Sequence, residues 1–451
     1  MKGKGYECRE CGYKSSGYFS KCPNCGQWNT FEEVVETKSK PGKPRGSSKP
    51  AKRLKDVSGE AKKRLLSGME EFDRVMGGGI VEDGVSILAA KPGAGKSTLL
   101  FQIANALAVE DLHVLYASGE ESETQIKMRA ERIADAISDN IWIYSGTSMD
   151  DVSHWIESVD ADVIILDSIQ TFTLDEFTAR AGTPTQTMEC ANRLVDYAKS
   201  SEKPRAVFIV GQLTKQDSLA GVRALEHLVD TVLYIDDEMR EELRILQATK
   251  NRFGSTGEMG FFNMTEKGML SIDNPSAHFM TKREAGSEVP GSAMCIVREG
   301  TRSIIVEIES LVSKSFTPYP ERISECFRRE QLGVLLSILE ERGRLSLYDK
   351  NVVVKTTGNL RLKEGACNLA ALMSMASAFK NKPIDRNTLF IGDVGLTGEL
   401  KNIPGMESRI KEAARMGFKT IYTPPMNQRK SIDGVEIKER RLLADVIKEN
   451  L

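Results

Sequence analysis

The chain has 451 residues, 28% of them charged, and a formal net charge of −2 at pH 7. Its length predicts roughly two to four domains, and its balanced charge excludes an argument for nucleic-acid binding from overall charge alone. No apolar run approaches the roughly 20 residues of a membrane span, and the polar start Met1–Gly5 lacks the apolar core of a signal peptide. We therefore expect a cytoplasmic protein without membrane contact.

Four of the eight cysteines lie near the amino terminus in two Cys-x-x-Cys pairs, Cys8 with Cys11 and Cys22 with Cys25. Four thiolates at this spacing predict a closed structural Zn²⁺ site, while iron ligation or a redox dithiol is the alternative. Residues 1–35 cannot bury a useful core, so the metal must supply the folding energy, about 10 kcal/mol in comparable modules. DNA, a protein partner and a neighbouring subunit all remain open as contacts of this zinc finger.

Residues 37–64 contain eleven Lys or Arg against two acids. The part through residue 55 is rich in Pro, Gly, Ser and Lys and predicts a flexible basic linker over residues 36–55. Such a linker can follow a phosphate backbone or can simply keep the chain soluble. The sequence does not separate these two roles.

A phosphate-binding loop follows the apolar run 85–89 and precedes the helical run 99–104. Gly93 and Gly95 let backbone N–H groups turn toward phosphate oxygens at a helix start. We expect Lys96 to reach the β- and γ-phosphates of ATP and Ser97 to hold Mg²⁺. The usual first glycine is Ala90 here. The predicted nucleotide-binding residues are Ala90, Lys91, Pro92, Gly93, Ala94, Gly95, Lys96, Ser97 and Thr98.

Apolar runs alternate with helical segments such as 188–198 across the rest of this region, which predicts a largely parallel sheet in an α/β domain. A short helix stopped by three glycines, Gly77–Gly79, precedes the strand that leads into the phosphate loop. The other expected strands are His113–Ala117, Ile141–Tyr144, Val163–Asp167, Ala206–Val210, Thr231–Ile235 and Leu243–Gln247.

Polar residues follow three of these strands where nucleotide chemistry needs them. Asp167 has the place of the acidic residue that steers Mg²⁺, so Ser97 and Asp167 are the predicted magnesium residues. A carboxylate after the strand at Tyr116 can orient or deprotonate the attacking water, and we favour Glu120 over Glu121. Gln212 is placed to sense the γ-phosphate.

The string Lys250-Asn251-Arg252-Phe253-Gly254 narrows the interpretation. Together with the cysteine pairs, the phosphate loop, Ser118–Ser122 and Val210–Lys215, it resembles the bacterial RadA (Sms) family of RecA-related ATPases over nearly the whole chain. The family has histidine more often than glutamine at position 212.

The resemblance implies a ring, expected to be a homo-hexamer, that binds single-stranded DNA in its channel and drives branch migration of branched DNA beside a RecA-type recombinase. Lys250 and Arg252 are the expected cations that act on a neighbouring subunit's nucleotide, with DNA backbone contact as the alternative for Arg252. The loop 214–221 resembles the segment that RecA-like proteins turn toward DNA. Candidate phosphate contacts are Arg180, Lys215 and Arg223.

After Pro275 we expect strands at 294–297 and 303–308, a helix from Ile323 to Leu339 and another from Glu407 to Met416. The segments 362–368 and 388–405 resemble the proteolytic domain of Lon. At the positions of its serine nucleophile and lysine base this chain has Cys367 and Glu407, and a thiol beside a carboxylate has a raised pKa. We therefore expect no peptidase activity, although Lys401 or Lys411 could supply a base if the alignment shifts.

The predicted fold is α/β: a RecA-like P-loop ATPase core with a small N-terminal zinc finger and a C-terminal α+β Lon protease-like domain. The expected boundaries are 1–35, 36–55, 56–275 and 283–451. The leading hypothesis is a DNA-dependent ATPase motor of recombination and DNA repair with ATP, Mg²⁺ and Zn²⁺ as cofactors. An ATP-dependent Lon-like protease and a nucleotide-controlled scaffold are the alternatives.

Overall fold

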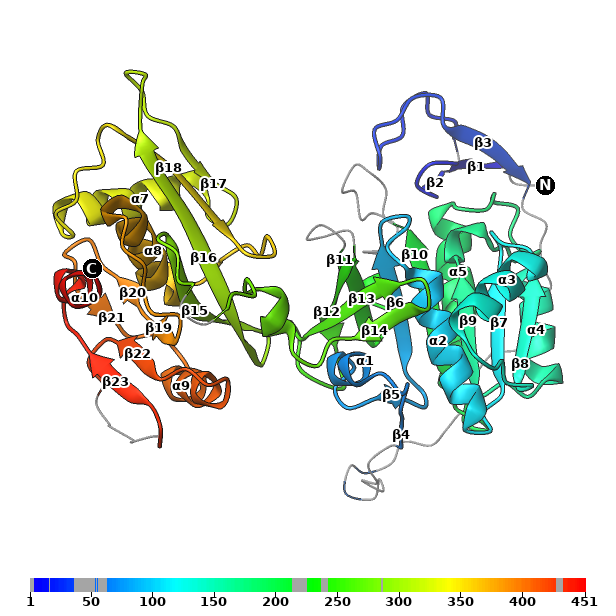
Figure 1. The fold of residues 1–451 in the computed structure, drawn as a ribbon. Coiled ribbons are helices and arrows are strands. Elements are labelled where there is room, and N and C mark those ends of the chain that lie inside the picture. Colours follow the sequence, from blue (N-terminus) through cyan, green and yellow to red (C-terminus); the bar gives the residue numbers. More distant parts are fainter. Residues whose placement is uncertain are drawn as a thin grey trace. The chain divides into compact units, whose positions relative to one another are not determined.

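In the computed structural model the described residues are 4–15, 17–35, 53, 55, 63–212, 225–236, 242–284, 287–426 and 433–451. The chain divides into two compact units. The first unit consists of Met1–Asp237 and Arg244–Ser271, and the second consists of Glu238–Leu243 and Ile272–Leu451. Figure 1 shows the elements of both units.

The amino-terminal module is a three-stranded antiparallel sheet of order β2-β1-β3. Its buried core consists of Cys8, Cys22 and Phe31, which is too little apolar surface to hold a fold by itself. The strands are β1 (Lys4–Cys8), β2 (Lys14–Ser15) and β3 (Phe31–Val35).

A nine-stranded sheet of order β14-β13-β12-β11-β6-β10-β9-β7-β8 organises the rest of the first unit. The strands from β6 to β11 pair in parallel, whereas β12 is antiparallel to β11, and β13 and β14 pair antiparallel. All of the expected strands are confirmed. The structure adds β13 and β14, which the sequence analysis did not predict. The bounds of the nine strands are β6 (Val85–Ala90), β7 (Val114–Ser118), β8 (Ile141–Ser145), β9 (Val163–Asp167), β10 (Ala206–Gln212), β11 (Thr231–Asp236), β12 (Leu243–Asn251), β13 (Met259–Thr265) and β14 (Gly268–Ser271).

Helices cover both faces of this sheet (Figure 1). One buried cluster joins the sheet to α1 (Glu70–Val75), α2 (Lys96–Val109) and α3 (Glu123–Ile133). A second cluster joins the opposite face to α4 (Met149–Ser158) and α5 (Pro184–Ala198). Because helices cover both faces of the sheet, the central strands are buried and apolar on both sides. A strand pair of β4 (Arg64–Leu65) and β5 (Ile80–Val81) flanks α1.

The second unit has a seven-stranded mixed sheet of order β17-β18-β16-β15-β19-β22-β23. The expected hairpin is β15 with β16, and α8 packs against both strands. The bounds are β15 (Ser292–Glu299), β16 (Arg302–Lys314), β17 (Arg322–Ser324), β18 (Lys350–Thr356), β19 (Thr388–Phe390), β20 (Asp393–Val394), β21 (Leu400–Lys401), β22 (Thr420–Thr423), β23 (Glu436–Glu439), α7 (Arg329–Glu341), α8 (Asn368–Lys380), α9 (Met406–Arg415) and α10 (Leu443–Asn450).

One helix boundary differs clearly from the sequence prediction. The helix expected from Ile323 begins at Arg329, because Ile323 lies in β17 and pairs with Val353 of β18. That strand partner is distant in sequence, so local periodicity could not reveal it. Among the residues that the structure describes, we find no helix with the length and apolar character that a bilayer-spanning segment needs.

Candidate functional site

The phosphate loop lies between β6 and α2 at the carboxyl edge of the parallel strands. Gly93 and Gly95 have φ angles of 83° and 100°, a left-handed conformation that glycine adopts without strain. The first turn of α2 carries no acidic residue, so no carboxylate of that turn offsets its N–H groups and the positive end of the helix dipole. Lys96 Nζ donates to the carbonyls of Ala90 and Lys91, both 3.2 Å away.

Asp167, at the end of β9, lies beside this loop. Its Oδ2 accepts hydrogen bonds from Ser97 Oγ at 2.8 Å and from Tyr116 Oη at 2.9 Å. Burial raises the pKa of Asp167, the hydrogen bonds from Ser97 and Tyr116 lower it, and the charges of Glu120 and Glu121 raise it again. The two predicted magnesium residues, Ser97 and Asp167, are thus in direct contact.

Glu120 and Glu121 follow β7 and have different partners. Glu120 Oε1 accepts a hydrogen bond from Ser168 Oγ, next to Asp167. Glu121 is held by both guanidinium nitrogens of Arg129 on α3. The ion pair constrains the Glu121 carboxylate, whereas Glu120 is on the Asp167 side of the turn.

The donor set fits Mg²⁺. Hard divalent cations prefer carboxylate and hydroxyl oxygens, and the residues here are Ser97, Asp167, Glu120 and Glu121 around one strand edge. Ser97 and Asp167 are the residues that would hold the ion, which would neutralise phosphate charge during hydrolysis.

The remaining predicted residues of this region fall in three places. Gln212 ends β10, and its backbone pairs in register with Ala90 on the neighbouring strand β6, between the loop and β9. Arg180 is exposed in the segment before α5, where its carbonyl accepts the hydroxyl of Thr183. Lys215 and Arg223 lie outside the described residues.

Residues 250–254 lie at the opposite end of the parallel strands from the phosphate loop. Asn251 pairs with Thr231 of β11, and Thr231 pairs with Ser86 near the start of β6. From Ser86 the strand runs about 13 Å further before the loop begins. Lys250 and Arg252 therefore lie far from the phosphate loop of their own chain.

Each member of this string has a distinct environment. Lys250 Nζ donates to the carbonyls of Glu226 and Val229. The side chain of Arg252 is 56% exposed and pairs with Asp230 at 3.2 Å. A Cβ on Gly254 would lie 2.8 Å from the Cα of Gly77, so the two backbones approach too closely for a side chain.

Four residues of the site were missed by the sequence analysis: Tyr116, Arg129, Ser168 and Arg244. Buried Arg244 on β12 donates from Nε to the phosphate-loop carbonyl of Ala94 at 3.2 Å. Arg129 donates to the carboxylate of Glu121, and Tyr116 donates to the carboxylate of Asp167. The sequence gives only a weak signal for these four residues, because each is a single hydroxyl or cation within an ordinary strand, turn or helix pattern.

The four amino-terminal cysteines converge. All their Sγ atoms lie within 4.8 Å of one another. The two pairs have matching turns, in which Gly12 N–H donates to the Cys8 carbonyl and Gly26 N–H donates to the Cys22 carbonyl. Four sulfur donors in such a cluster fit a tetrahedral structural Zn²⁺ without an open position.

In the second unit, Cys367 is fully buried and its Sγ donates to the backbone carbonyl of Glu364 at 2.9 Å. Burial, followed by Cys295 and Glu364, raises its pKa well above the usual value. Glu364 also forms a bidentate ion pair with Arg409 at 2.8 and 2.6 Å. Glu407 is on the surface, 3.0 Å from Lys411. The carboxylate beside the thiol is thus Glu364 and not Glu407.

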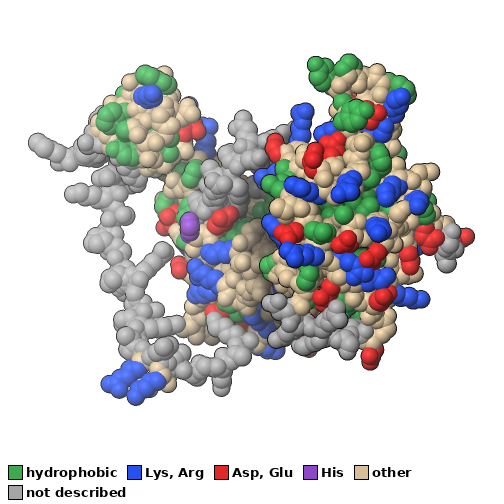
Figure 2. Space-filling view, turned by 90° about the vertical axis from the view of Figure 1, so that its left-hand side faces the viewer, with side chains coloured by type: hydrophobic (Ala, Val, Ile, Leu, Met, Phe, Trp, Pro, Cys, Tyr) green, Lys and Arg blue, Asp and Glu red, His purple; other side chains and the backbone are tan. Residues whose placement is uncertain are grey.

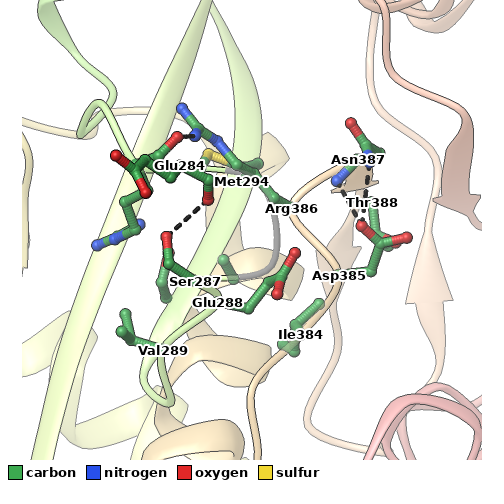
Figure 3. Close-up of a pocket in the computed structure, with 13 residues that line it drawn as sticks. Glu284, Ser287, Glu288, Val289, Met294, Ile384, Asp385, Arg386, Asn387 and Thr388 are labelled. Atoms are coloured by element: carbon green, nitrogen blue, oxygen red, sulfur yellow. Dashed lines mark hydrogen bonds between the residues drawn. The ribbon is translucent and has the colours of Figure 1, made fainter.

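A pocket in the second unit lies between the segment before β15 and the segment before β19 (Figure 3). Arg386 crosses one side of it and donates to the carbonyls of Arg283 and Thr281 at 2.8 and 2.9 Å. Asp385 is exposed and accepts from the backbone N–H of Asn387 at 2.9 Å. These contacts hold the two chain segments together.

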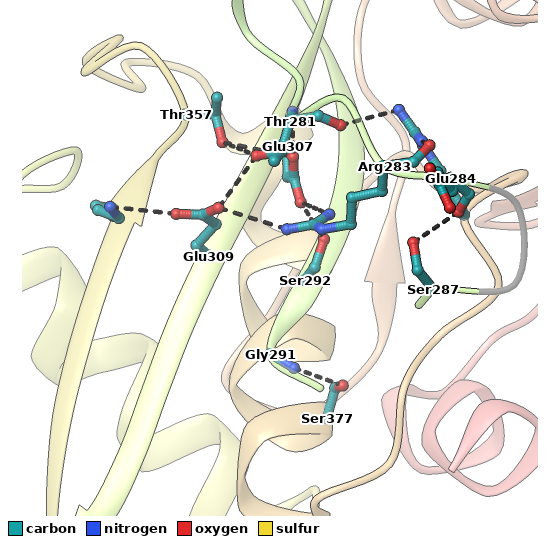
Figure 4. Close-up of polar contacts among 12 residues, drawn as sticks. Thr281, Arg283, Glu284, Ser287, Gly291, Ser292, Glu307, Glu309, Thr357 and Ser377 are labelled. Atoms are coloured by element: carbon teal, nitrogen blue, oxygen red, sulfur yellow. Dashed lines mark hydrogen bonds and ion pairs between the residues drawn. The ribbon is translucent and has the colours of Figure 1, made fainter. Parts of the chain in front are cut away.

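Beside this pocket, buried Glu307 of β16 collects the polar contacts of Figure 4. It accepts from the N–H of Thr281 at 2.7 Å and from Ser292 Oγ at 2.5 Å, and it pairs with Arg283. Burial alone would raise the pKa of Glu307, but the hydrogen bonds from Ser292, Thr281 and Arg283 hold it below its ordinary value. The network fastens the segment before β15 to the sheet.

The face of the second unit in Figure 2 carries Lys and Arg side chains interspersed with Asp and Glu. Hydrophobic side chains gather at the top, at the end of the projection built by β16. The exposed aromatic residues of this unit include Phe316 and Tyr319, in the segment between β16 and β17, and Tyr348, just before β18. On this face the basic side chains form no single patch among the described residues.

Together, the fold and the site define a P-loop ATPase that carries a metal-binding ribbon and a Lon-type domain. Family models match each part. One described as "AAA domain" covers residues 49–199, one described as "Rubredoxin metal binding domain" covers 6–33, and one described as "Lon protease (S16) C-terminal proteolytic domain" covers 352–447. The predicted fold class is confirmed.

The curated relatives include "DNA repair protein RadA" of Listeria monocytogenes, 39% identical over 426 residues, which are 94% of this chain and 92% of the relative. The protein of the same name from Streptococcus pyogenes is 39% identical over 436 residues, 96% and 94%. That of Bacillus subtilis is 39% identical over 427 residues, 93% and 92%. The chain belongs to the family of bacterial DNA repair protein RadA.

Proposed function

We propose that the chain is a DNA-dependent ATPase that works as a ring-shaped motor on single-stranded DNA and promotes branch migration in recombination and repair. A homo-hexamer in the cytoplasm, beside a RecA-type recombinase and branched DNA, is part of this proposal. The observation that carries this proposal is that the predicted catalytic groups are divided between the two ends of the parallel strands. Ser97, Asp167 and Glu120 are at one end and Arg252 is at the other.

Within one active site the residues have separate roles. Lys96 would contact the β- and γ-phosphates, and Ser97 with Asp167 would hold Mg²⁺. Glu120 orients the attacking water and accepts its proton, while Gln212 senses the γ-phosphate from β10. Arg252, together with Lys250, would act on the γ-phosphate bound by the neighbouring subunit. An arginine supplied in this way accelerates phosphoryl transfer by about 10³- to 10⁵-fold.

DNA contact is assigned to Arg180, Lys215 and Arg223, which would bind the phosphate backbone without reading sequence. We retain the division into zinc finger, linker, ATPase core and Lon-like domain at 1–35, 36–55, 56–275 and 283–451. Peptidase activity is not part of the proposal. The buried thiol of Cys367, whose raised pKa disfavours the nucleophilic thiolate, supports a structural role for that loop.

Steady-state ATPase assays of the full chain with and without single-stranded DNA test this proposal. We expect DNA to stimulate turnover and Lys96→Ala to lower it by at least about 100-fold. Lys127→Ala is the matched control, because Lys127 is an exposed lysine of the same unit that pairs with Glu131 at 3.9 Å. An ATP turnover rate that is the same with and without DNA would contradict the proposed motor function. Nucleotide binding without turnover would instead support the scaffold.

A further inference from the structure

The amino-terminal module exposes more aromatic surface than its own packing explains. Tyr13, Tyr18, Phe19 and Trp28 are 40%, 53%, 44% and 65% exposed. Tyr13, Tyr18 and Phe19 each meet buried Phe31 edge to face, at centroid distances of 6.4, 6.4 and 5.8 Å. Those three rings therefore stabilise the small core even though about half of each is open to solvent.

Trp28 has a different environment. It shows no ring contact with Phe31 among the described residues, and it is the most exposed of the four aromatic side chains. Lys21 pairs with it across an isolated antiparallel bridge and places Nζ 5.4 Å from the indole centroid. A large flat ring with an ammonium group beside it is left open on the second cysteine turn.

Such a pairing of open rings and cations suits single-stranded nucleic acid. Every base has a π face that stacks on an aromatic side chain, and nearby cations neutralise the backbone. The charge of the chain agrees with this occupant, since the stretch that follows the module, residues 37–64, contains eleven Lys or Arg against two acids. An apolar protein partner would not explain the cation beside Trp28.

We propose that the zinc module is a base-stacking site for single-stranded DNA, with Trp28 as the platform, Lys21 as the backbone contact, and Tyr18 and Phe19 as further rings. The inference rests on the proposed DNA-directed function and adds a contact surface that is separate from the ATPase core. Because a duplex hides its base faces, the site selects single strands without selecting sequence.

Tryptophan fluorescence of the full, zinc-loaded chain tests the site. A thymidine oligonucleotide should quench Trp28, whereas an abasic deoxyribose-phosphate strand of equal length and a duplex should not. Trp28→Ala should weaken binding of the oligonucleotide by roughly five- to a hundred-fold. Trp28→Phe keeps a ring and should retain most of the affinity. Trp155→Ala is the matched control, since Trp155 is 41% exposed but lies on α4.

The outcomes separate this inference from the proposed function. If Trp28→Ala binds the thymidine strand as well as the wild type does, or if the abasic strand quenches equally, the stacking site is wrong while DNA-stimulated ATPase activity can still stand. If the wild type binds no single strand at all, both fail. Zinc content is measured for every variant, and should Trp28→Ala lose zinc, the wild-type comparison of thymidine and abasic strands decides alone.

Discussion

At the scale of single residues, some parts of the nucleotide-binding site can be predicted from the local sequence and others cannot. The phosphate loop and Asp167 belong to short contiguous motifs, so they could be predicted. Tyr116 could not, because a tyrosine in an apolar strand resembles any core residue, and its partner Asp167 is 51 positions away. The same holds for Arg129, whose ion pair with Glu121 depends on how α3 packs.

The two adjacent glutamates give the first prediction. Glu120→Gln should lower kcat by about 10²- to 10⁴-fold with nucleotide affinity nearly unchanged, because it removes the proton acceptor but keeps the shape. Glu121→Gln breaks the ion pair with Arg129 and should lower thermal stability more than kcat. Steady-state kinetics, nucleotide titration and thermal unfolding of both variants are the measurements. A larger loss of kcat in Glu121→Gln would reverse the assignment.

Tyr116→Phe is the second prediction. The hydroxyl of Tyr116 donates to Asp167 and lowers the pKa of that buried carboxyl, so its removal should raise that pKa. A carboxylate holds Mg²⁺ only when ionised. The acidic limb of the ATPase pH profile should therefore move to higher pH, and more Mg²⁺ should be needed for half-maximal rate at acidic pH. Tyr144→Phe, which removes a hydroxyl bonded to Asp151 on the surface, is the control. Superimposable pH profiles for Tyr116→Phe and wild type would disprove the role.

At the scale of elements, the buried strands could be predicted from the local sequence, whereas some helix starts could not. The apolar strands of the ATPase sheet were evident because both faces are covered, whereas α5 starts four residues before the expected position, at Pro184 after the cap Thr183. The error at Ile323 has a separate cause. A short edge strand such as β17 exists only through its pairing with β18, which the sequence places after a whole helix.

Glu307 gives a prediction at this scale, because it joins the segment before β15 to β16. Its pKa is lowered in the folded chain, so it contributes stability above its unfolded pKa of about 4.3 and loses that contribution as pH falls through the folded value. Glu307→Gln should cost about 3 kcal/mol at pH 7, since it leaves Arg283 without its buried partner.

Calorimetric unfolding of the full chain at several pH values measures this effect. The difference between Glu307→Gln and wild type should begin to shrink as pH falls below the unfolded pKa of about 4.3, and it should be lost only below the lowered folded pKa, where the native carboxylate is protonated too. Glu436→Gln is the control, because Glu436 is a 65% exposed member of a surface pair with Lys438 in the same unit. A gap that stays constant from pH 7 to pH 3 would show that ionisation of Glu307 is irrelevant.

At the scale of the whole molecule, the phosphate loop and Arg252 lie at opposite ends of the parallel strands, although the proposed phosphoryl transfer needs both at one nucleotide. Asn251 pairs through β11 with the start of β6, and the phosphate loop follows its end. No rotation of the Arg252 side chain spans that separation. In the ring that we propose, a second copy of the chain placed head to tail would bring Arg252 of one subunit to the phosphate loop of the next, and repetition of that contact would close the ring.

Mixed oligomers test this sharing of sites. Lys96→Ala and Arg252→Ala should each be nearly inactive alone, but a one-to-one mixture should regain about a quarter of wild-type turnover, because that share of interfaces joins an intact loop to an intact arginine. A mixture of Lys96→Ala with Glu120→Gln is the control and should stay inactive, since both lesions affect the same half of the interface. If Arg252 acts within its own chain, no mixture recovers. If Arg252 contacts only DNA, Arg252→Ala should keep its DNA-independent turnover, and that result would exclude the shared site directly.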